Sequence, residues 1–192
     1  MDIPQKVNEM NELIKILWKI LMRKSDQMAL PNSRLLLLVV FILYFFTNSI
    51  SGLTVSVSSA IFIRSFTIDA LLLIVFLRLL TQFFKTQDDF IRSLIALFGT
   101  GALFNLIASP LIIKFSSLLE QEDLIESGDL PIWLPLLFFA IAIWSIMVMG
   151  HILSRSMTST KESISKPPIS GVAVALLYMM INFLVHSSIL GD

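Results

Sequence analysis

Five long apolar stretches, separated by short polar connections, dominate the hydrophobic pattern of the chain. They run over residues 35–57, 60–84, 92–117, 132–153 and 168–190. Each supplies about 20 mostly apolar residues, which is the length that a helix needs to cross a bilayer core of about 30 Å. Because lipid cannot hydrogen-bond an open backbone, such stretches cross as helices. The pattern predicts an all-α, polytopic membrane protein whose residues 35–190 form one five-helix transmembrane domain.

The segment before the first stretch follows a different pattern. Its apolar residues recur at helical spacing, while its charges fall mostly on other faces; the apolar residues are Val7, Met10, Ile14, Leu17, Trp18 and Leu21. We therefore predict that residues 1–34 form a cytoplasmic amphipathic helix and a linker. This helix is expected to lie in the membrane interface, where four basic side chains would contact anionic headgroups: Lys15, Lys19, Arg23 and Lys24. The alternative is a helix packed on the end of the bundle or on a partner.

Charge is distributed unevenly between the connections. Twelve of the 14 basic residues fall before the first stretch, at the second connection or at the fourth. The third connection has no basic residue and carries five acidic residues, Glu120, Glu122, Asp123, Glu126 and Asp129. The positive-inside rule then predicts a cytoplasmic N-terminus and a C-terminus on the outer side. We expect the membrane to be a bacterial inner membrane, in which the outer side is periplasmic. Five spans, an odd number, require the termini to lie on opposite sides.

Composition agrees with this class and narrows the chemistry. Apolar residues make up 56% of the chain and charged residues 15%, too little polar surface to coat a soluble globule. The chain has no Cys and two His, which fall on different predicted helices, so no zinc site can be drawn. No Gly-x-Ser-x-Gly motif is present either. We predict no enzymatic activity, no cofactor, no metal site and no nucleic-acid partner.

A few polar residues interrupt the predicted spans. Asp69 is the most costly of them, because a carboxylate inside a bilayer is normally satisfied within the bundle. With the predicted topology, the outer halves of the spans would bring together a polar cluster of Asp69, Arg64, Lys114, His186, Asn105 and Asn182. Lys114 or His186, from another helix, is expected to be the partner of Asp69. The cluster serves either to orient the helices or to relay protons or ions.

The third stretch carries the most distinctive local sequence. Gly99 and Gly101 lie inside it, and glycines within a membrane helix usually mark a close helix crossing. Pro110 removes a backbone donor and favours a kink. We predict that Gly99, Gly101 and Pro110 serve helix packing. Asn105 is expected to hydrogen-bond across helices.

The order of these features resembles the bacterial branch of the Yip1 family. The features are an amphipathic lead and five spans. At the entry to the third span and within the third and fourth spans, the residues that carry the resemblance are Asp88, Asp89, Phe90, Ile91, Arg92, Gly99, Pro110, Trp144 and Gly150. The resemblance covers about residues 35–190. It implies a non-enzymatic membrane protein that organises other membrane proteins.

Two functions are compatible with these predictions. The favoured one is a scaffold or accessory subunit that contacts lipid headgroups and a membrane-protein partner, or that forms a homo-oligomer. The alternative is a small transporter or channel subunit with a polar path around Asp69.

Overall fold

The structure, a computed structural model, describes residues 3–55, 58–119, 131–158 and 169–190. Within these ranges the chain forms six α-helices, two 3-10 turns and no strand. The α-helices are α1 (Ile3–Leu21), α2 (Arg34–Val55), α3 (Ser59–Phe83), α4 (Phe90–Leu119), α6 (Trp133–Met157) and α7 (Ile169–Leu190). The 3-10 turns are η1 (Gln27–Ala29) and η2 (Gln87–Asp89).

Five of the helices, all except α1, are long and apolar enough to cross a membrane. The predicted all-α fold with five such helices is confirmed. Their ends lie within four residues of the predicted ones, and the largest difference is at α6, which continues to Met157. Helix α2 ends at Val55, two residues before the predicted end of the first span.

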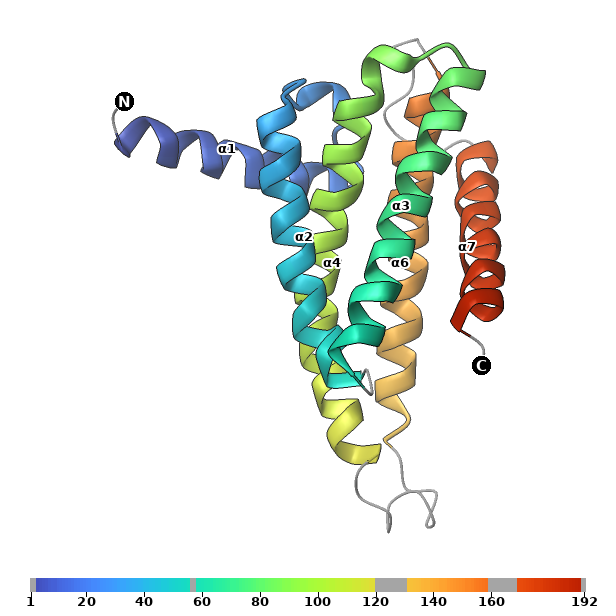
Figure 1. Cartoon of the computed structure of the whole chain (residues 1–192). Coiled ribbons are helices and arrows are strands. Elements are labelled where there is room, and N and C mark those ends of the chain that lie inside the picture. Colours follow the sequence, from blue (N-terminus) through green and yellow to red (C-terminus); the bar gives the residue numbers. More distant parts are fainter. Residues whose placement is uncertain (1–2, 56–57, 120–130, 159–168, 191–192) are drawn as a thin grey trace.

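Helix α4 is the centre of the bundle. The five long helices run side by side, and α1 crosses them near one end (Figure 1). Helix α4 packs against α1, α2, α3 and α6, while α7 packs against α6 and α3. In the most apolar 18-residue stretch of each helix, 44% is buried for α4, whereas 11–28% is buried for the other four helices. The remaining surface of those helices is available to lipid or to other proteins.

Basic residues end two of the helices in a left-handed conformation. Arg23 after α1 has φ 55° and Lys85 after α3 has φ 58°. In both turns the following amide bonds back to the helix, from Lys24 to the Lys19 carbonyl at 2.8 Å and from Thr86 to the Thr81 carbonyl at 2.9 Å. This Schellman pattern satisfies carbonyls that would otherwise lack donors. The turns lead the chain into η1 and η2.

Aromatic rings fill the space between α2, α3 and α4. The Phe98 ring of α4 lies 5.1 Å from the Phe41 ring and 5.3 Å from the Tyr44 ring, both of α2. Phe66 of α3 completes the group, 5.7 Å from Tyr44. Tilted and edge-on rings at these separations attract each other beyond simple area burial.

Glycines bring α6 and α7 into backbone contact. Both Gly150 and Gly171 are buried. A Cβ atom on Gly171 would collide with the Gly150 carbonyl oxygen and would lie 2.6 Å from the Ser154 Cβ atom. Only a residue without a side chain therefore fits at 171, and this contact fixes the position of the least buried helix.

We expect Gly171→Leu to displace α7 and to lower the free energy of unfolding by about 1–3 kcal/mol, the usual cost of overpacking. Ala173→Leu is the matched control, because Ala173 is exposed on the same helix. Unfolding of both variants in mixed micelles, followed by circular dichroism, measures the difference. Equal stability of the two variants would show that the glycine contact does not hold α7.

Candidate functional site

Asp69 lies in α3, opposite polar side chains of α7. The His186 imidazole lies beside it, with its Nε2 atom 3.6 Å from Asp69 Oδ1. Ser65 Oγ lies 3.0 Å from the same His186 nitrogen. The Tyr178 hydroxyl donates to the Asp69 backbone carbonyl at 3.5 Å. The structure therefore brings Asp69 and His186 together, as expected for one of the two predicted partners.

Two cavities adjoin Asp69. The larger has a volume of about 310 Å³, and all five long helices contribute to its wall. The smaller, of about 250 Å³, lies towards the α2–α3 connection. Asp69 belongs to both walls. The other polar residues of the larger wall are Tyr44, Thr100, Asn105, Ser145, Tyr178 and Asn182.

Several polar atoms around these cavities have no hydrogen-bond partner. Asp69 Oδ1, Asn182 Oδ1 and Asn105 Nδ2 are each inaccessible to solvent, and none of them forms a hydrogen bond within the described residues. The prediction that Asn105 bonds across helices is therefore wrong for its amide nitrogen. Buried polar atoms without partners are costly, and they are concentrated where proteins bind ligands or ions.

The structure does not place the other two predicted members in this cluster. Arg64 donates through Nη2 to the Ile189 carbonyl at 2.8 Å, near the end of α7. The Lys114 ammonium lies 4.9 Å from the centre of the Trp133 ring, where cation–π attraction holds it. Lys114 is therefore not the partner of Asp69. Arg and Lys side chains are long enough to reach partners at a different depth in the bundle from their own Cα atoms.

The three predicted packing residues of α4 meet different neighbours. A Cβ atom on Gly99 would lie 2.7 Å from the Leu17 side chain of α1, and one on Gly101 would lie 2.9 Å from the Tyr44 ring of α2. Pro110 lies inside the helix and cannot bond the Leu106 carbonyl. The Ser109 hydroxyl donates to that carbonyl instead, at 3.1 Å. The helix thereby continues through Pro110 to Leu119.

The buried face of α1 differs from the apolar face that the sequence predicts. The buried residues are Leu13, Leu17, Ile20 and Leu21, which pack on α4. Ile14 and Trp18 were expected on the same apolar face, yet they are 50% and 47% exposed. The end of α1 thus packs on the bundle, which is the alternative considered above, and exposes a second apolar strip.

The predicted headgroup-contact residues lie at the surface of this helix and the turn after it. Lys15, Lys19 and Lys24 are exposed, and Arg23 is half-buried. The Lys15 ammonium donates to Glu12 Oε1 at 2.8 Å, and this bond lowers the pKa of the Glu12 carboxyl group. Exposed basic residues of this kind can contact anionic headgroups.

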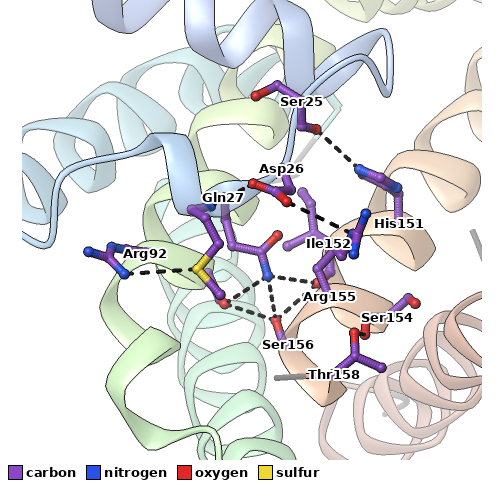
Figure 2. Close-up of polar contacts among 12 residues, drawn as sticks. Ser25, Asp26, Gln27, Arg92, His151, Ile152, Ser154, Arg155, Ser156 and Thr158 are labelled. Carbon is purple, nitrogen blue, oxygen red and sulfur yellow. Dashed lines mark hydrogen bonds and ion pairs between the residues drawn. The ribbon is translucent and has the colours of Figure 1, made fainter. Parts of the chain in front are cut away.

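A polar network that the sequence analysis missed ties η1 to α4 and α6 (Figure 2). The fully buried Gln27 donates through Nε2 to the Ile152 carbonyl at 3.2 Å and to the Ser156 hydroxyl at 3.3 Å. Ser93 and Ser156 share a hydrogen bond of 2.8 Å. The Thr86 hydroxyl donates to the Ser156 carbonyl. Four separate segments are therefore joined at one point.

Further polar contacts fasten the residues between α1 and η1 to α6. Trp144 Nε1 donates to the Leu21 carbonyl at 3.1 Å. His151 Nε2 lies 3.1 Å from the Ser25 carbonyl, and Asp26 Oδ2 lies 4.0 Å from Arg155 Nε (Figure 2). We call this group and the Gln27 network together the anchor. The sequence gives little indication of the anchor, because polar residues at the end of a membrane helix normally face water.

No family model, curated protein or solved structure matches the chain. The resemblance to the Yip1 family stays a prediction. Within the described residues no three His, Asp or Glu side chains are grouped so that they could hold a metal ion.

We expect Gln27→Leu to loosen α1, because the substitution removes the donor that reaches both Ile152 and Ser156. A loss of about 1 kcal/mol would raise the open fraction about fivefold. The chain has no native Cys, so alkylation of an Ile20→Cys variant reports the opening, since Ile20 is fully buried. Gln82→Leu, at an exposed position, is the control. An unchanged alkylation rate in the Gln27 variant would contradict a role for this network in holding α1.

Proposed function

We propose that this protein is a non-enzymatic accessory subunit or scaffold of a bacterial inner membrane, which binds another membrane protein through α1. One observation carries the proposal: α1 is held at its C-terminal end by the anchor, while its N-terminal end projects beyond the bundle (Figure 1). A helix held in this way has a defined direction before it binds. Binding then costs less conformational entropy than ordering a free segment would.

The surface of α1 suits such a role. Ile14 and Trp18 are exposed on it beside the exposed Lys15 and Lys19. Amphipathic helices with exposed apolar anchors bind in grooves of partner proteins, and tryptophan is frequent among the residues that dominate binding energy. The lysines can hold the helix at anionic headgroups, so that the apolar strip meets its partner at the membrane surface.

The distribution of charge supports a cytoplasmic location for α1. The α1 end of the bundle also carries η2 and the C-terminal end of α6, and therefore Lys85, Arg92 and Arg155 (Figure 1). Lys15 and Lys19 lie on α1 itself. An excess of basic residues at one end favours the cytoplasmic side. The role implied by the Yip1 resemblance, organising other membrane proteins, agrees with this arrangement.

Removal of residues 1–12 tests the proposal. The deletion takes away the projecting end of α1 but keeps the buried residues from Leu13 onward and the whole anchor. At native expression level we expect a stoichiometric partner to co-purify with the full chain in mild detergent and to be lost from the truncated one. Mass spectrometry identifies the partner and measures its amount.

A variant in which an unrelated helix-forming sequence replaces residues 3–12 is the control for helix length. It should also lose the partner if the contact is specific. Both variants keep the exposed Ile14 and Trp18, so Trp18→Asp tests that strip separately. Retention of the partner by all three variants would contradict the proposal. A full chain that purifies as a homo-oligomer without partners would instead favour the second function.

That second function is a small transporter or channel subunit, favoured by the cavities on either side of Asp69. Carboxylates in membrane spans commonly mark the paths of ions and protons. Solute or proton uptake into vesicles that contain the purified chain tests this function, and Asp69→Asn should abolish uptake.

A further inference from the structure

The larger cavity has the composition of a ligand site. Its volume of about 310 Å³ lies in the range of small-molecule pockets, about 300–1,000 Å³. Its wall is mostly apolar and aromatic, with a few polar groups on different helices. Such a wall gives a ligand both a hydrophobic surface and fixed points of orientation.

Asp69 supplies the one carboxyl group among the described residues that line either cavity, and no Lys or Arg is among them. His186 Nε2, at 3.6 Å, is too far from Asp69 Oδ1 for a hydrogen bond. Asp69 Oδ1 has no hydrogen-bond donor, although the Asn182 side chain hydrogen-bonds the carboxyl group. A cationic ligand would add a further donor and a positive charge beside this group.

The rest of the wall favours an organic cation over a metal ion. Tyr44, Phe98, Phe104 and Tyr178 surround the space, and aromatic faces attract ammonium groups. Asn182 Oδ1 can accept a second hydrogen bond from the ligand, because it has no partner. A dehydrated metal ion requires several oxygen ligands close together, and in the part of the chain that the structure describes no three His, Cys, Asp or Glu side chains are grouped for this.

We infer that the cavity binds a small organic cation, a protonated amine whose ammonium group pairs with Asp69 and whose apolar part packs against the surrounding aromatic rings. No residue of α1 is among the described residues that line this cavity, so the site requires neither the partner nor the contact proposed above.

Isothermal titration calorimetry on the full chain tests this inference, with benzylammonium chloride as the probe. The protein is held in nanodiscs of uncharged lipid, so that anionic headgroups do not capture the cation. Benzyl alcohol is the neutral comparison, and potassium chloride tests an inorganic cation. We expect saturable binding of benzylammonium at one site, and weaker or no binding of the other two.

Two variants act on different parts of the site. Asp69→Asn should weaken benzylammonium binding by about tenfold or more, because it removes the charge and keeps the shape. Ser145→Leu should also weaken binding, because it fills part of the cavity and keeps the carboxylate. Asp88→Asn, at an exposed position of η2, should bind as the parent does.

Three results would overturn the inference. They are no binding to the full chain, equal binding of benzyl alcohol and benzylammonium, and undiminished binding by Asp69→Asn. Stronger binding of potassium would replace the organic ligand with an inorganic one. If Asp69→Asn does not fold, as judged by circular dichroism, the Ser145 variant and the comparison with benzyl alcohol decide the outcome.

Discussion

Close contact between helices at small residues is the constraint on which this bundle depends. Apolar helices in a bilayer gain little from leaving lipid for one another, so direct packing must supply much of their association. Gly171 against Gly150 joins α7 to α6, and Gly101 against the Tyr44 ring joins α4 to α2. Gly99 accepts Leu17 in the same manner. The polar side chains that bond between helices reach their partners because these small residues let the helices lie close together.

The two polar regions of the bundle differ in what surrounds their polar atoms. In the anchor, Gln27, Ser93 and Ser156 hydrogen-bond to one another and to the Ile152 carbonyl, although Gln27 Oε1 has no partner. Such a network favours one arrangement of its segments. Around Asp69, buried carboxylate and amide atoms also lack partners, and there they adjoin two cavities. The first region holds the chain together, while the second has space for a ligand beside its unpaired atoms.

The five long helices could be predicted because length and hydropathy are local properties. The buried face of α1 could not, because apolar residues lie on more than one side of that helix and its packing on α4, with Leu17 against Gly99, decides which of them are buried. The pairing of Asp69 with His186 followed from their expected depth. The contact of Gln27 with Ser156, 129 positions away, has no local signal. Tertiary packing alone brings these two together.

The residue of α4 that contacts α1 and residues that line the larger cavity lie on the same turn of α4. Leu17 rests on Gly99, and the next two residues, Thr100 and Gly101, line the cavity. Trp144, which hydrogen-bonds to the end of α1, packs edge-on against Phe104 in the same wall, with ring centres 5.1 Å apart. Binding of a molecule in the cavity and binding of a protein to α1 would thus be thermodynamically linked. If binding at one site shifts this turn and so changes the affinity of the other site, the second ligand must change the affinity of the first by the same factor.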